Sequence, residues 1–357
     1  MGKKQHYVPQ FYLRNFSDEK GKNVGFFRFD RQKFIRNAAI SSVAYRDNLY
    51  DDNDEVEKAL SVEESKWKKI IDIFLGKNVT DETLNWLEIN ADETVHQLLS
   101  FISITEARTT QQGDGISWFM KTLEKTIGRE MTKDTYNQYF GDLQEYIKHP
   151  NIIPLQVAQN LLPYYSGLDL LVIVNTTRQR FITSDVPVFN LNPYYLKRKY
   201  HRSFGLQAMG LQKFLPISGY CCLCFYDRNV YKRNCDSTIY FLRSERLVHR
   251  MNKIIVENAY EQIFFDVNEE EEYIQKICKR RKVDNKSSII FWGKKNQPQF
   301  LNLHSENIWT PMMLPCFLIK KEALKIPLPT HMGGLVRPEV TELNLYDETE
   351  EPYNFDA

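Results

Sequence analysis

The sequence predicts an α+β fold with an N-terminal β-hairpin, a central helical bundle, and an antiparallel sheet in the middle with helices packed on it. Three observations predict this fold. Aromatic and β-branched runs around a polar turn open the chain, apolar residues then recur at spacings of three and four, and continuous apolar runs follow. With 357 residues, of which 42% are hydrophobic, the chain can bury a core without disulfides. This composition excludes collagen-like, low-complexity and wholly disordered proteins.

The first elements are a hairpin and a run of helices. Gly25–Asp30 and Gln32–Asn37 flank a tight polar turn, as the strands of a hairpin do. From Asp54, apolar residues recur at helical spacing as far as Phe74, and Gly76 supplies a stop signal. Two more helices are expected, one from residue 91 or 92 to Arg108 and one over residues 116–147 with a break at Gly128.

The middle of the chain is rich in β-strand signals. Leu168–Asn175 and Arg180–Val188 are expected to form two antiparallel strands. The run Tyr220–Tyr226 is predicted to share a sheet with the segment LQKFLPIS, and its side chains should alternate between faces. Residues 237–282 are expected to be helical, followed by a strand at IIFWGKK and a Pro-rich tail over the surface. We divide the chain into an opening segment with the hairpin (1–53), a helical region (54–150), a sheet with a long helix (151–300) and a Pro-rich tail (301–357). Together they are expected to form one compact unit.

Composition narrows the function only by exclusion. Lys and Arg number 47 against 46 Asp and Glu, so the net charge of +1 does not favour a polyanionic partner. The chain shows no secretory signal and no apolar run that could span a membrane, and its six cysteines form neither a disulfide framework nor a zinc knuckle. We therefore expect a cytoplasmic protein with no membrane partner. Without GxxxxGK[ST] or GxGxxG, no nucleotide cofactor is expected.

The opening segment HYVPQFYLRNF is the densest chemical signal. Pro9 requires an extended segment before it and is able to open a short helix, which places His6 before the turn and Gln10 and Arg14 on one helical face. An imidazole beside an amide and a guanidinium can grip a phosphate and move a proton near neutral pH. Alternatively, the histidine caps the helix and the arginine ties the terminus to an acidic residue.

Further candidates lie in two other segments. Asp185, with Ser184 beside it, follows a predicted strand, and it is expected to be a divalent-metal ligand, a general base, the partner that orients His6, or an Asx-turn that pins the strand end. The role of any metal stays open. Arg108 ends a helix and is either a dipole partner or a cation aimed into a cleft. His96, beside apolar residues, is expected to be a satisfied core or boundary residue.

One basic segment has the composition of a surface that binds single-stranded RNA. It interleaves cations with tyrosines, which suits stacking and charge contacts with a single RNA strand, although a solvated loop has the same composition. The candidate RNA-binding residues are Lys197, Arg198, Tyr200 and Arg202.

HYVPQFYLRNF resembles the opening signature of a bacterial domain-of-unknown-function family, DUF4238. The helix ending in Arg108, the segment FITSDVPV, the motif FLPIS and the helix Glu245–Asn258 also match, so the resemblance covers Lys4 to Phe265. Members of this family are encoded in defence islands, and some are similar to single-gene anti-phage systems. The resemblance implies a defence effector and assigns no catalytic residue.

Two functional hypotheses follow. In the first, the chain is a toxic ribonuclease in which His6 and Asp185 perform acid–base chemistry while Arg108 and Arg14 clamp a phosphate. In the second, it is a non-catalytic sensor or interaction module triggered by a phage protein, and the signature is a structural clasp between the N-terminus and the central sheet. The sequence does not decide the oligomeric state.

Overall fold

The apolar run Leu168–Asn175 forms strand β5, and its alternating side chains explain the layers of the protein. Leu170 and Val174 belong to one hydrophobic core, whereas Leu171 and Ile173 belong to a second core. Successive residues of a strand point to opposite faces, so β5 is covered on both sides. The computed structural model describes residues 2–75, 91–127, 148–199, 205–234, 237–279, 281, 287–294, 297–304, 312–328 and 335–343.

The central sheet has five strands in the order β11-β5-β9-β8-β7. All neighbours are antiparallel except β11, which pairs parallel with β5. Strand β9 shows the predicted alternation, because Cys222 and Cys224 enter one core while Cys221, Leu223 and Phe225 enter the other. The strands besides β5 are β7 (Phe189–Leu191), β8 (Gln212–Pro216), β9 (Cys221–Asp227) and β11 (Ile239–Leu242).

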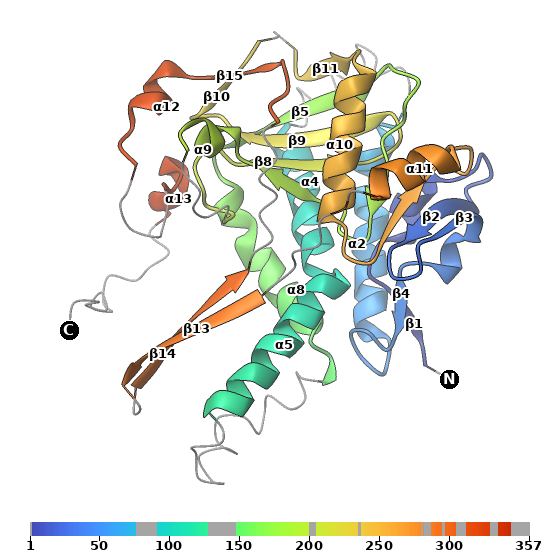
Figure 1. Ribbon diagram of the computed structural model, residues 1–357, viewed down its shortest axis with the longest axis horizontal. Coiled ribbons are helices and arrows are strands. Elements are labelled where there is room, and N and C mark those ends of the chain that lie inside the picture. Colours follow the sequence, from blue (N-terminus) through green and yellow to red (C-terminus); the bar gives the residue numbers. More distant parts are fainter. Residues whose placement is uncertain are drawn as a thin grey trace.

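Helices cover both faces of this sheet. Figure 1 shows α10 crossing one face of the sheet, with α4 on the opposite side. Helices α2 and α4 bear out the two helices predicted first, and α5 begins six residues before the predicted start at 116. The predicted region 128–147 lies outside the described residues. The helices are α2 (Glu55–Asp72), α4 (Ala91–Ala107), α5 (Thr110–Ile127), α8 (Ile152–Ala158), η4 (Gln159–Tyr165), α10 (Glu245–Asn258) and α11 (Glu271–Cys278).

A second sheet has the order β3-β2-β12-β6, and it contains the predicted N-terminal hairpin of β2 and β3. Two expectations were wrong here. The segment after β5 does not pair with β5, since its short strand β6 pairs with β12 instead. Residues 237–282 are not continuously helical, because β11 and β12 lie on either side of α10. The strands are β2 (Asn23–Arg28), β3 (Lys33–Ala39), β6 (Thr183–Ser184) and β12 (Gln262–Phe265).

Three two-stranded sheets complete the described fold, and the C-terminal region is more than a surface drape. Arg337 is fully buried and donates to the carbonyls of Ser166, Leu206, Ala208 and Tyr164. Among the described helices, none is long and apolar enough to cross a bilayer. The remaining elements are β1 (Lys4–His6) with β4 (Tyr45–Asp47), β10 (Tyr231–Arg233) with β15 (Phe317–Ile319), β13 (Ser287–Lys294) with β14 (Gln297–His304), α1 (Gln10–Leu13), η1 (Arg14–Phe16), η2 (Ile40–Ser42), α9 (Pro193–Lys197), α12 (Lys321–Lys325) and α13 (Pro338–Thr341).

Candidate functional site

The N-terminal signature is part of the first core rather than a loose terminus. Strand β1 pairs antiparallel with β4, and Pro9 keeps an extended conformation, with φ −56° and ψ 134°, immediately before α1. Tyr7, Val8 and Tyr12 are buried. Chain ends are usually the least ordered part of a domain, so this burial requires strong contacts with the rest of the protein.

His6 is buried between the signature and α2, beside polar side chains. Its residue surface is 6% exposed, and its Nδ1 lies 3.4 Å from Gln10 Nε2 and 3.8 Å from Glu57 Oε1. The His6 Nε2 and Glu57 Oε2 atoms are buried and have no hydrogen-bond partner among the described residues. The structure therefore brings His6 and Gln10 together, and it adds a carboxylate that no sequence pattern indicated.

Arg108 binds the backbone of the signature from the end of α4. Its Nη2 donates to the His6 carbonyl at 2.5 Å, its Nη1 donates to Glu64 Oε1 at 2.7 Å, and its Nε donates to Tyr50 Oη at 3.3 Å. The side chain is 1% exposed. This guanidinium ties the terminus to an acidic residue, which is the structural role considered for Arg14, whereas Arg14 is exposed. The signature cluster is hereafter His6, Gln10, Tyr50, Glu57, Glu64 and Arg108.

Other signature side chains bind the central and second sheets. Tyr12 Oη lies 2.7 Å from Thr183 Oγ1 and donates to the Pro216 carbonyl at 2.5 Å. Tyr7 Oη accepts a hydrogen bond from Gln262 Nε2 at 2.7 Å. Thr183 belongs to the segment FITSDVPV and Pro216 to FLPIS, so one tyrosine joins three of the motifs singled out in the sequence.

Asp185 is fully buried, and its carboxylate holds the chain before β12. One oxygen accepts from the backbone amide of Tyr260 at 2.8 Å, and the other accepts from the amides of Glu261 at 2.5 Å and Gln262 at 3.1 Å. Burial raises the pKa of Asp185 to about 6, although these hydrogen bonds act in the opposite direction. Ser184 Oγ bonds locally to the backbone of Val186. The described part of the chain contains no hydrogen bond between Asp185 and His6.

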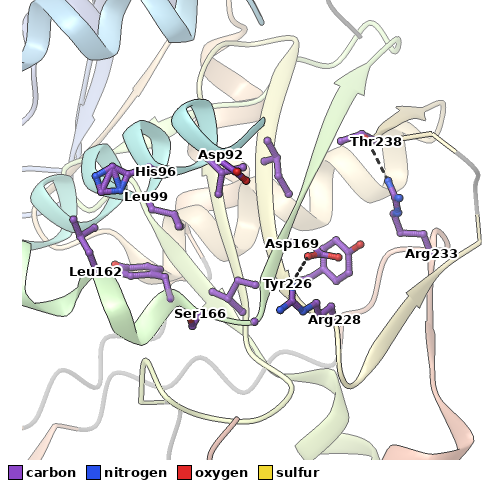
Figure 2. A pocket seen from close by; sticks show the side chains of 15 residues that line it. Asp92, His96, Leu99, Leu162, Ser166, Asp169, Tyr226, Arg228, Arg233 and Thr238 are labelled. Carbon is purple, nitrogen blue, oxygen red and sulfur yellow. Dashed lines mark hydrogen bonds and ion pairs between the residues drawn. The ribbon is translucent and has the colours of Figure 1, made fainter. Parts of the chain in front are cut away.

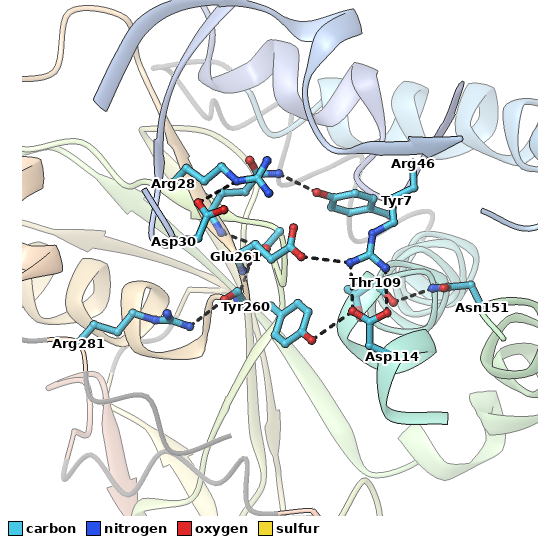
Figure 3. A network of polar contacts seen from close by, with 12 residues as sticks. Tyr7, Arg28, Asp30, Arg46, Thr109, Asp114, Asn151, Tyr260, Glu261 and Arg281 are labelled. Carbon is cyan, nitrogen blue, oxygen red and sulfur yellow. Dashed lines mark hydrogen bonds and ion pairs between the residues drawn. The ribbon is translucent and has the colours of Figure 1, made fainter. Parts of the chain in front are cut away.

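A second polar network joins distant segments beside the segment that Asp185 holds (Figure 3). Arg46 donates to both carboxylate oxygens of Asp114, at 2.8 and 3.0 Å, and to Glu261 Oε1 at 3.1 Å. Tyr260 Oη donates to Asp114 Oδ2 at 3.1 Å, and burial together with the Asp114 carboxylate raises the pKa of Tyr260 to about 12. No sequence motif marked these residues. Each of the charged groups is paired, so the network joins β4 and α5 to the segment between α10 and β12.

The proposed RNA-binding segment is only partly described. Lys197 is exposed at the end of α9. Arg198 is half-buried and donates to Tyr194 Oη and to the Ile326 carbonyl, both at 2.5 Å. Tyr200 and Arg202 lie outside the described residues. Arg198 therefore has an intramolecular role that a solvated loop would not require.

An open cleft lies between α4 and η4 on one side and the start of β5 with the end of β9 on the other. Its volume is about 530 Å³, within the usual range for ligand sites. In Figure 2, Asp92, His96 and Leu99 lie beside α4 on one side of the pocket, and Asp169, Tyr226 and Arg228 lie together on the other side. We call this cavity the α4 cleft; its lining residues are Asp92, Val95, His96, Leu99, Leu162, Tyr165, Ser166, Gly167, Leu168, Asp169, Leu170, Tyr226, Arg228, Arg233 and Thr238.

The α4 cleft corrects the interpretation of His96. The sequence indicated a core or boundary residue, but His96 is exposed at the cleft. Asp92, one helical turn earlier, lines the same cleft, and this i to i+4 spacing is the signal that the sequence offered. Charged side chains from α4 and from the start of β5 both line this cleft.

The described residues contain no group of three or more His, Cys, Asp and Glu side chains that could hold a metal ion. Asp185 accordingly has backbone amides as its partners. No curated protein and no solved structure matches the chain significantly. Residues 4–269 match the family described as "Protein of unknown function (DUF4238)". The matched region covers most of the chain, so this protein belongs to the DUF4238 family.

Proposed function

We propose that this chain is a non-catalytic sensor or interaction module of a bacterial anti-phage system, acting in the cytoplasm with a phage protein as its trigger. One observation carries the proposal: Arg108 and Asp185, two side chains that the sequence indicated as catalytic, bind the protein's own groups. Arg108 is occupied by Glu64, Tyr50 and the His6 carbonyl, and Asp185 is occupied by backbone amides. A group that is sealed and bonded in this way stabilises the fold and does not reach a polymeric substrate.

The defence role rests on the resemblance of HYVPQFYLRNF to proteins from defence islands. The structural support concerns the sensor role. The α4 cleft is open to solvent and lined by charged side chains, so it is a suitable surface for a ligand or partner.

The experiment compares variants of the buried residues His6 and Asp185 with a variant of the α4 cleft, in cells challenged with a panel of phages. His6→Ala and Asp185→Asn should lower the melting temperature and the protection against phage together, because both residues act through folding. His96→Ala, at an exposed position of the cleft, should keep the melting temperature and reduce protection. A His6 variant with normal stability but no protection would contradict the clasp.

A second candidate function, a toxic ribonuclease, is favoured by one observation. His6 Nε2 and Glu57 Oε2 are both buried without a partner among the described residues, which leaves an acid–base pair with unused hydrogen-bonding capacity. In this alternative, His6 moves the proton and Arg108 fixes its backbone. RNA breakdown in expressing cells that is abolished by Glu57→Gln at unchanged melting temperature would favour the ribonuclease over the sensor.

A further inference from the structure

The α4 cleft has an apolar part and a charged rim. Leu99, Leu162 and Tyr165 provide apolar surface beside α4 and η4. Arg228 and Arg233 approach from the sheet side, while Asp92 and Asp169 carry the opposite charge. An apolar body with one anionic group and a few N–H or O–H donors would match this distribution, because the arginines donate and the aspartates accept.

Arg228 already binds a carboxylate that belongs to the C-terminal segment. Its Nε donates to Glu339 Oε1 at 3.2 Å, and Asn229 Nδ2 donates to Glu339 Oε2 at 2.8 Å. Gly167, which has φ +80°, gives the carboxylate room, since a Cβ at this position would lie 2.5 Å from Glu339 Oε2. A guanidinium, an amide and a glycine thus form a cradle for an anionic oxygen group.

The cleft is formed by residues of the matched family region, whereas Glu339 lies beyond residue 269. The neighbouring Arg337 is fully buried and donates hydrogen bonds to four backbone carbonyls. It therefore anchors this segment independently of Glu339. The Glu339 side chain is 23% exposed and the Arg228 side chain is 53% exposed. The contact between them is therefore at the surface, where salt bridges contribute little and side chains exchange partners readily.

We propose that the α4 cleft binds a small ligand with an apolar body and a carboxylate or phosphate group, and that Glu339 occupies the anion position at Arg228 when the ligand is absent. Neutralising Glu339 frees the guanidinium for the ligand. The biological purpose of this ligand rests on the proposed sensor function. The binding itself does not, because the experiment measures it on the purified chain alone.

The experiment measures binding to the full-length chain by isothermal titration calorimetry. One probe is adenosine 5′-monophosphate, which carries a phosphate, and the other is N-benzoylglycine, which carries a carboxylate. Glu339→Gln should bind at least one probe about tenfold more tightly than the unaltered chain, because the competing carboxylate is removed. The probe whose affinity rises identifies the anionic group.

Three further variants make the result decisive. Glu342→Gln, one turn after Glu339 and exposed, should leave the affinity unchanged. Arg228→Ala added to Glu339→Gln should remove the gain. Glu339→Ala, which also removes the carboxylate that accepts from Arg228 Nε, should tighten binding in the same way and replaces Glu339→Gln if that variant folds poorly. The proposal is overturned if neither neutralised variant binds either probe more tightly than the unaltered chain, or if the gain survives Arg228→Ala.

Discussion

The signature cluster and the α4 cleft both contain a histidine, at least one arginine and carboxylates, but they differ in access to solvent. In the signature cluster, Arg108 is 1% exposed and has three partners. In the cleft, Arg228 is 53% exposed, and it forms salt bridges with Asp169 and Glu339 at the surface. The comparison teaches that residue type indicates the possible chemistry, whereas burial and partners decide whether a side chain stabilises the fold or meets a ligand.

The largest effect is expected for Arg108→Met, which tests the structural side of the comparison. The substitution removes a buried cation, so the His6 carbonyl and the Glu64 carboxylate lose their hydrogen-bond donor. The free energy of unfolding should therefore fall by about 3–5 kcal/mol. Urea denaturation measures the change. Arg14→Met is the matched control at an exposed site and should stay within about 0.5 kcal/mol. Equal effects at the two arginines would remove the distinction between them.

The pH dependence of Asp185 gives the next effect. Its pKa in the folded chain is about 6 against an ordinary value of 3.8, so the folded state holds the proton more tightly. This contribution to stability is fully present below pH 3.8 and is lost as the pH rises through about 6. The full difference corresponds to about 3 kcal/mol.

Denaturation midpoints at several pH values between 4 and 7 test this contribution. Asp185→Asn cannot titrate, so its stability should fall less between pH 4 and pH 7 than that of the unaltered chain. Its absolute stability should also be lower, because an amide nitrogen cannot accept the backbone N–H bonds. Identical pH slopes for both proteins would show that Asp185 titrates normally in the folded chain.

Tyr12→Phe is expected to have a smaller effect. It keeps the buried ring and removes the hydroxyl that contacts Thr183 and donates to Pro216. Leaving these groups without a partner should lower the free energy of unfolding by about 1–2 kcal/mol. Chemical denaturation measures the change, with Tyr45→Phe at a partly exposed ring as the control. A neutral result would mean that Tyr12 contributes by packing alone.

The smallest effect is expected in the cleft. His96→Ala removes an exposed side chain, so the free energy of unfolding should change by no more than about 0.5 kcal/mol. The same denaturation experiment, run beside Arg108→Met, completes the comparison. A loss above about 2 kcal/mol would place His96 among the residues that hold the fold and would weaken the cleft as a binding surface.

Local patterns predicted a large part of the fold. The period of three to four residues located α2 and α4, and the alternation in β9 assigned each cysteine to the correct face. Strand pairing was less predictable. The segment containing Thr183 and Ser184 follows β5 closely in sequence but pairs with β12, because partner choice depends on side-chain packing between distant segments.

The candidate site divides in the same way. The placement of His6 beside Gln10 was predictable, because Pro9 keeps the segment before it extended and starts a short helix after it. Glu57, Glu64 and the amides that bind Asp185 come from elements far along the chain, and no local pattern indicates them. His96 was misplaced because an amphipathic pattern identifies the inner face of a helix and does not show where that helix borders a cavity.

The sequence by itself determined the α+β class, the helical and strand periods and the family, because these depend on local residue patterns and on one specific opening motif. Only the tertiary structure decided that Arg108 and Asp185 are sealed by the protein's own groups while Arg228 and His96 face an open cleft. The reason is physical: exposure and hydrogen-bond partners arise from contacts between segments that are distant along the chain, and these contacts set the environment of every charged group.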